Sequence, residues 1–121
     1  MKIAAFLDWL TQKYPLPVGL IVNYEVYDVE IFENDSNDSA AYGVVDVVDD
    51  IEGITGAAFI SIAGKAPIPP IEILAHEYCH IIQMFVWETF PQNMKHPQYD
   101  HHLEKEARYF AKRMVEDYSC R

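Results

Sequence analysis

Cysteine is scarce in this sequence of 121 residues, and it has no long apolar run. The two cysteines, Cys79 and Cys120, cannot supply the disulfide framework of a small secreted domain. No stretch approaches the roughly 20 apolar residues that span a bilayer, and Asp8 interrupts the apolar start of the chain too early for a signal peptide. We therefore expect reduced thiols, a cytoplasmic location and no membrane association.

Positive charge is also scarce, because 9 lysines and arginines stand against 19 aspartates and glutamates, for a formal net charge of −10. A chain of this charge, without a cluster of basic side chains, repels phosphate. We therefore expect no nucleic-acid partner. The acidic stretch over residues 46–52 lacks the ligand spacing of a calcium loop and is interpreted as solvated surface.

The chain does have enough apolar sequence for a core, because half of its residues are hydrophobic. Its length and the lack of internal repeats predict a single domain over residues 1–121. Periodicity and turn residues predict helices over 3–13, 71–89 and 102–118, and strands over 18–27, 42–48 and 57–63. The first strand continues as, or turns into, a short strand through Phe32. One helix, then strands, then two helices predicts the α+β class.

Residues 76–80 read His-Glu-Tyr-Cys-His, which is the HExxH pattern of zinc-dependent hydrolases. Pro70 precedes a long segment that is free of glycine and proline, so the motif is expected on a helix. Residues four apart lie on one helix face, which allows His76 and His80 to present ring nitrogens to one zinc ion. The carboxylate of Glu77 lies beside them and can act as general base toward a water on that ion.

The helix expected to carry this motif is apolar nearly all round, which is typical of a buried helix. Two histidines and a carboxylate on the flank of a buried helix need polar partners, and a metal ion accounts for all three. Two other interpretations stay open. HExxH has only three fixed positions and occurs by chance, and paired histidines on a helix can be hydrogen-bonded core residues.

A catalytic zinc ion needs a third protein ligand and keeps its fourth position for water. The metzincin arrangement is excluded, because Val86 stands where its third histidine would be and Gln83 where its glycine would be. The candidates further along the chain are His96, Asp100, His101, His102, Glu104 and Glu106.

Helical periodicity in the C-terminal segment separates these candidates. Placed at about 100° per residue, the apolar stripe of this helix centres between Leu103 and Ala111, and Glu104 falls at its edge. Glu106 falls well off the stripe, on the side shared with Arg113. We therefore expect Glu104 to be the ligand and Glu106 to be a surface residue, with a solvated glutamate as the alternative for both.

The two segments together resemble a known pattern, because HEYCH at residues 76–80 is followed by EKEARYFA at 104–111. The pairing looks like that of the gluzincins. It is most similar to the ImmA/IrrE-type metallopeptidases, which carry HExxH followed by a helix reading ExEAxxFA, and to the small minigluzincins. The resemblance covers residues 76–114.

This resemblance implies zinc as the cofactor, with His76, His80 and Glu104 as its ligands and Glu77 as the catalytic base. It also implies a minimal zincin-like fold of the α+β class. In such a fold a small antiparallel or mixed sheet of about three to four strands packs on the HExxH helix, together with N- and C-terminal helices.

Two positions depart from the pattern of that family. Cys79 stands where the family usually has glycine, and Arg108 stands where it often has an asparagine or aspartate that supports a zinc-bound histidine. An arginine cannot accept a hydrogen bond. Support for the histidines is therefore expected from elsewhere, either from Asp100 or from a backbone carbonyl.

The segments before and after the HExxH helix are candidates for binding the substrate and for stabilising the transition state. Tyr99, His101 and His102 follow the helix and are candidates for stabilising the oxyanion or supporting a ligand. The strand over residues 57–63 precedes the helix, and the resemblance implies that it forms the sheet edge along which an extended peptide pairs. An ordinary core strand is the alternative interpretation.

Motif and resemblance together predict a zinc-dependent endopeptidase that hydrolyses peptide bonds of a narrow protein or peptide substrate. One alternative is a zincin-like module that binds metal and a protein partner without cleaving it. Another is a metal-free α+β interaction domain in which HExxH is coincidental. Metal content separates the last from the other two, and a Glu77→Gln comparison separates the first two.

Overall fold

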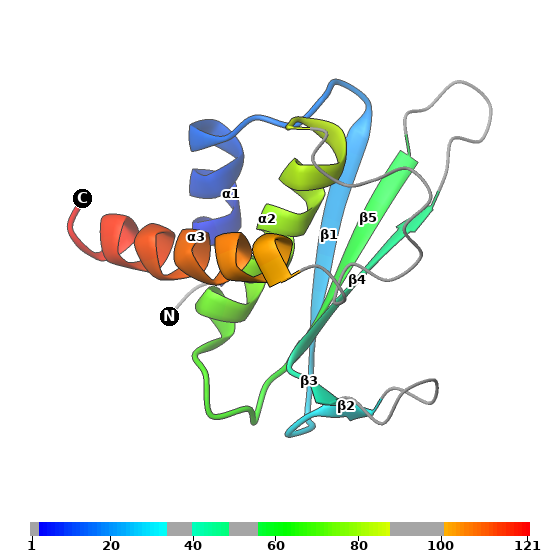
Figure 1. Ribbon diagram of the computed structural model, residues 1–121, viewed down its shortest axis with the longest axis vertical. Coiled ribbons are helices and arrows are strands. Elements are labelled where there is room, and N and C mark those ends of the chain that lie inside the picture. Colours follow the sequence, from blue (N-terminus) through cyan, green and yellow to red (C-terminus); the bar gives the residue numbers. More distant parts are fainter. Residues whose placement is uncertain (1–2, 34–39, 49–55, 88–100) are drawn as a thin grey trace.

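The computed structural model describes residues 3–33, 40–48, 56–87 and 101–121 (Figure 1). In chain order the elements are α1 (Ile3–Lys13), β1 (Leu20–Tyr27), β2 (Phe32–Glu33), β3 (Ala40–Ala41), β4 (Gly43–Val48), β5 (Gly56–Ala63), α2 (Pro70–Phe85) and α3 (His101–Ser119). Within the described ranges, three helices combine with a three-stranded mixed sheet and the small pair β2–β3. The α+β class expected from the sequence is therefore confirmed.

The larger sheet has the strand order β1-β5-β4. β1 runs parallel to β5, with Leu20 opposite Gly56, and β4 runs antiparallel to β5, with Gly43 opposite Ile62. β5 is therefore the central strand, and the expectation that residues 57–63 form a sheet edge is wrong. Its parallel partner β1 is far away in the chain, and such a pairing is not encoded in the local pattern of either strand. Among the described strands, the edges of this sheet are β1 and β4.

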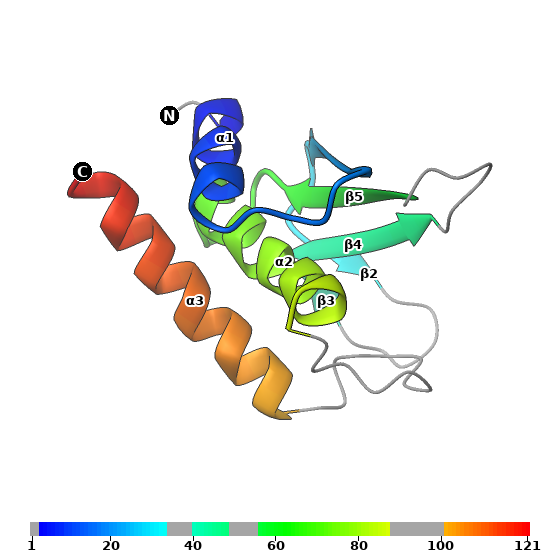
Figure 2. The ribbon, with the colours of Figure 1, turned by 90° about the horizontal axis from the view of Figure 1, so that it is seen from above.

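All three helices lie on one face of this sheet (Figure 1), and α2 lies between the sheet and α3 (Figure 2). Side chains of a strand alternate between the two faces of a sheet. In β5, Ala58, Ile60 and Ile62 are buried in the core that the helices share. Phe59 points to the other face and is 45% exposed. The hydrophobic core thus lies between the sheet and the helices, with α2 at its centre.

α1 has the bounds predicted from the sequence and packs through one face. Its buried side chains, Phe6, Leu7 and Leu10, lie on the side expected of an amphipathic helix. The hydroxyl of Tyr78 on α2 donates to the carbonyl of Tyr14, just after α1, at 2.6 Å. This hydrogen bond and the apolar contacts around it fix α1 against α2.

α2 is shorter than predicted. It begins at Pro70, and proline is favourable at the first turn because its missing N–H would have no partner there. At the other end, the N–H groups of Val86 and Trp87 both donate to the carbonyl of Ile82 at 2.9 Å, which widens the last turn and closes the helix. The prediction that the helix continues through Val86 and Trp87 is wrong, and residues 88–89 lie outside the described ranges.

The remaining elements lie close to their predicted ranges. β1 starts at Leu20, after Gly19 with a φ of 93°, a left-handed conformation that glycine adopts without strain. Phe32 belongs to a separate short strand that pairs with β3, so the first strand does not continue to it. α3 extends the predicted range by one residue at each end. No helix in the described part of the chain is both long enough and apolar enough to cross a membrane.

Candidate metal centre

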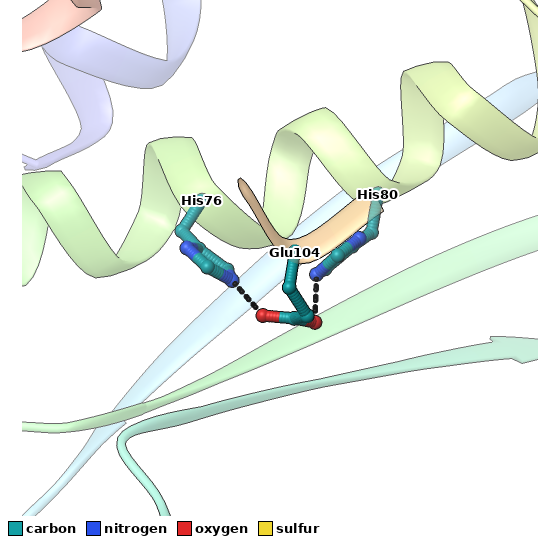
Figure 3. A group of neighbouring side chains, drawn as sticks. All are labelled: His76, His80 and Glu104. Carbon is teal, nitrogen blue, oxygen red and sulfur yellow. Dashed lines mark hydrogen bonds and ion pairs between the residues drawn. The ribbon is translucent and has the colours of Figure 1, made fainter. Parts of the chain in front are cut away.

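α2 carries the HExxH residues in helical conformation, as predicted. His76 and His80, one turn apart, project from the same side of the helix, with ring centroids 5.0 Å apart (Figure 3). His80 is buried and His76 is half-buried. The helix interior contains no glycine and no proline beyond its first residue, so its backbone hydrogen bonds keep this spacing.

The carboxylate of Glu104 on α3 lies between the two rings (Figure 3). Its Oε2 is 3.1 Å from Nε2 of His76, and its Oε1 is 3.0 Å from Nε2 of His80. α3 can approach α2 closely because its small residues Ala107 and Ala111 are buried in the core that the helices share. The ligand atoms of the two histidines and the glutamate lie within 4.8 Å of one another, so the structure brings together the group that the sequence predicted.

These three residues fit a metal ion. Two imidazoles and a carboxylate are a donor set of divalent transition metals, zinc among them. Ligand atoms around a tetrahedral zinc ion stand roughly 3.3 Å apart. The nitrogen–oxygen distances of 3.1 and 3.0 Å are close to this value but run to different oxygens of Glu104, and the three ligand atoms lie within 4.8 Å of one another. A metal ion would therefore draw the side chains somewhat closer together, and it would replace the hydrogen bonds that they share.

Mutual hydrogen bonds shift the titration of this group. Burial opposes the charged form of Glu104, but hydrogen bonds from His76 and His80 outweigh it and hold the pKa of this carboxyl well below its usual range. Burial likewise favours neutral His80, but the hydrogen bond to Glu104 and the charge of Glu77 raise the pKa of this imidazole. Both shifts favour a proton on His80 beside a charged Glu104, so a metal ion competes with a proton for this imidazole.

Glu77 follows His76 on the helix and is only 8% exposed. Burial raises the pKa of its carboxyl, while the two neighbouring histidines act in the opposite direction. Gly43, the first residue of β4, lies directly against it, because a Cβ at this position would stand 3.0 Å from both Cγ and Oε1 of Glu77. The lack of a side chain at Gly43 thus leaves the space that the Glu77 carboxylate occupies.

Gln83 is the residue of this site that sequence reasoning missed. It lies one turn beyond His80 on α2, it is fully buried, and its Oε1 is 2.8 Å from Nδ1 of His80. Its Nε2 donates to the carbonyl of Leu103 at 3.0 Å and to Oε1 of Glu106 at 2.9 Å. The expected sources of support were a backbone carbonyl and Asp100, which lies outside the described residues. Among the described residues, the side chain of Gln83 provides such support for His80.

The sequence does contain a signal for Gln83. It is an uncharged polar residue flanked by the apolar pairs Ile81–Ile82 and Met84–Phe85, and such a residue needs partners once it is buried. Glu106 has the exposed position predicted for it, but its carboxylate also accepts the hydrogen bond from Gln83. The expected surface position of Glu106 is confirmed, and the structure adds its contact with Gln83.

The other residues named from the sequence contribute less. Arg108 and His102 are exposed on α3. Burial raises the pKa of the Cys79 thiol to about 12, so this residue is a neutral core side chain. His101 begins α3, and only its backbone is described. His96, Tyr99 and Asp100 lie outside the described residues.

No protein-family model, no curated protein and no solved structure matches this chain. The similarity to gluzincins accordingly rests on the two motifs alone. The site is therefore recognised from its geometry. His76 and His80 of α2 meet Glu104 of α3, and the buried carboxylate of Glu77 lies beside them.

Proposed function

We propose that this protein is a zinc-dependent endopeptidase that hydrolyses peptide bonds of a narrow protein substrate. The observation that carries the proposal is the group His76, His80 and Glu104, with Glu77 buried beside it. Two imidazoles and one carboxylate leave a fourth position of zinc open, as in catalytic rather than structural zinc sites. The ligands stand on two helices that pack against each other, so the scaffold already holds them close together.

A zinc ion would be held by His76, His80 and Glu104, and when bound it would supply the Lewis acidity that makes water reactive at neutral pH. Glu77 would accept the proton of the attacking water and return it to the leaving amine. Its burial suits this role, because a carboxylate whose pKa is raised is a stronger base than one in water. His76, His80 and Glu104 act as ligands only.

The position of β4 supports a polypeptide as the substrate. β4 is a sheet edge among the described strands, and its first residue, Gly43, lies against Glu77. An extended peptide that pairs with this edge through main-chain hydrogen bonds would run past Glu77. We therefore assign substrate binding to β4, in place of the central strand β5.

A glutamine at the position of Glu77 tests the proposal. Glu77→Gln keeps the size of the side chain and removes the base, so the variant should retain zinc and lose hydrolysis by several orders of magnitude. Wild type and variant are each incubated with a proteome extract, and new N-termini are mapped by mass spectrometry. Glu116→Gln, the same chemical change at an exposed position near the end of α3, is the matched control.

Cleavage sites shared by wild type and Glu116→Gln, and abolished by Glu77→Gln or by a chelator, are the expected result. Identical maps from wild type and Glu77→Gln, with zinc retained in both, would instead identify a metal-binding module that acts through contact with a protein partner. Protein without zinc and without cleavage would point to the metal-free interaction domain.

A further inference from the structure

Gln83 is an uncharged polar side chain in the hydrophobic core. It is fully buried, and a buried amide costs free energy unless its donors and its acceptor find partners. Both ends of the amide are satisfied. Oε1 faces Nδ1 of His80, and Nε2 donates to the Leu103 carbonyl and the Glu106 carboxylate.

The partners of Gln83 determine which way its amide points. A backbone carbonyl only accepts hydrogen bonds, so the NH2 group must face the carbonyl of Leu103, and it also donates to Glu106. The oxygen Oε1 then faces His80, where it can only accept. Nδ1 of His80 must therefore carry a hydrogen, and Nε2, 3.0 Å from Glu104, is the nitrogen available to a metal ion.

We propose that Gln83 is a positioning residue of the metal centre, which holds His80 in the tautomer and ring orientation needed for ligation through Nε2. Glu106 anchors this arrangement, because it holds the Gln83 amide from α3 while Glu104 of the same helix faces the histidines. The inference rests on the metal site proposed above. Gln83 would set how strongly His80 donates its Nε2 lone pair to a metal ion. Hydrogen-bond partners of this kind typically contribute roughly 10–100-fold to metal affinity.

The same hydrogen bonds join the two helices that supply the ligands. His80 and Gln83 belong to α2, whereas Leu103 and Glu106 belong to α3. Gln83 therefore helps to hold the alignment of the helices at which Glu104 meets His80. An apolar side chain in its place would leave Nδ1 of His80 without this acceptor inside the core.

Four variants separate positioning from packing. Gln83→Met keeps the length of the side chain and removes both hydrogen-bonding functions. Gln83→Glu keeps an acceptor for His80 but brings a second carboxylate against Glu106. The double variant Gln83→Glu/Glu106→Gln, called the exchange variant, exchanges the two side chains and so places an amide donor opposite the new carboxylate again. Glu106→Gln alone keeps an acceptor for Gln83 and completes the double-mutant cycle.

Two measurements are made on these variants. Zinc affinity is determined by competition with a chromogenic chelator. Nitrogen-15 spectra of the zinc-saturated proteins, in which the proton no longer occupies both ring nitrogens, show which ring nitrogen of His80 carries a hydrogen. Wild type should carry a hydrogen on Nδ1, and Gln83→Met should lose this preference and bind zinc about 10–100-fold more weakly. Gln83→Glu should also bind more weakly, and the exchange should recover part of that loss, because the two positions act as a coupled pair.

Retention by Gln83→Met of both the Nδ1 hydrogen and wild-type zinc affinity would overturn the inference. An exchange variant that binds zinc no better than Gln83→Glu would overturn it as well. If Gln83→Met does not fold, this comparison alone decides the question. Failure of the metal site itself can be told apart from failure of the positioning role, because the wild type would then bind no zinc. Failure of the positioning role alone would leave wild-type binding intact and the variants indistinguishable from it.

Discussion

Gly43 at the start of β4 lies against Glu77 on α2, with no room for a side chain between them. A Cβ on Gly43 would stand 2.7 Å from Cγ2 of Ile73 and 3.0 Å from Oε1 of Glu77. The edge strand and the proposed catalytic base are thus in direct contact, although they are far apart in the sequence. This contact makes Gly43 a position where a single methyl group should disturb the site.

We expect Gly43→Ala to impair catalysis while the metal ligands stay in place. The added methyl group must displace Ile73 or Glu77, at a cost of roughly 1–3 kcal/mol for overpacking. Urea denaturation should show this loss, zinc content should be unchanged, and the cleavage rate of the folded protein should fall. Gly64→Ala, whose Cβ would meet residues of β1, should lower stability without lowering that rate. An unchanged rate in Gly43→Ala would contradict the role of this contact.

Glu104 and Glu106 are close together on α3 but should differ in their effect on metal binding. Glu104→Ala removes a proposed metal ligand, so zinc affinity should fall by more than the roughly 10–100-fold typical of an outer hydrogen-bond partner. Glu106→Ala removes only the anchor of Gln83, so its loss should not exceed that range. Zinc titration against a competing chelator measures both. A greater loss from Glu106→Ala would show that the wrong face of α3 was assigned to the metal.

The stability of the metal-free protein should depend on pH through His80 and Glu77. Folding raises the pKa of both, so each contributes stability that is present below its unfolded pKa and is lost as the pH rises through the folded pKa. The free energy of unfolding should therefore fall as the pH rises. The fall begins above pH 4.5 for Glu77 and above pH 6.5 for His80, the ordinary pKa values of these groups. Glu104 has a lowered pKa, so its contribution is lost only as the pH falls below 4.5. Urea denaturation in the presence of a chelator measures this profile.

Zinc should act against this trend. The pKa of His80 is raised, so a proton competes with a metal ion for this imidazole most strongly at low pH, and the stability that zinc adds should grow as the pH rises. Denaturation at several pH values, with saturating zinc and with a chelator, gives this increment directly. An increment that stays constant or shrinks with rising pH would argue against His80 as a ligand.

The two cysteines should differ in reactivity. Burial raises the pKa of the Cys79 thiol to about 12, whereas Cys120 is exposed. A thiol reagent at neutral pH should label Cys120 in the native protein and both residues in urea. Mass spectrometry of the labelled peptides distinguishes the two sites. Fast labelling of Cys79 in the native state would contradict the burial of α2.

Local sequence periodicity predicted those helices and strands whose bounds depend only on nearby residues. The bounds of α1 and the helical placement of His76 and His80 follow from the spacing of apolar side chains and prolines within each segment. The central position of β5 could not be predicted in this way, because it depends on a parallel pairing with β1 from a distant part of the chain.

The same distinction holds within the site. Helical periodicity of α3 alone favoured Glu104 as the partner of the two histidines, and the structure brings these three side chains together. Gln83 was missed because its partners, the Leu103 carbonyl and the Glu106 carboxylate, come from α3, and only the packing of α2 on α3 brings them within reach. Zinc binding and hydrolysis stay predictions.

The claim that His76, His80 and Glu104 hold a metal ion is tested most directly by elemental analysis of the purified protein after mild dialysis. About one zinc ion per chain is expected in the wild type. His80→Ala, which removes the more buried of the two histidines, should lose it. A wild-type chain that contains no metal, and whose thermal stability does not change when zinc is added, would contradict the site.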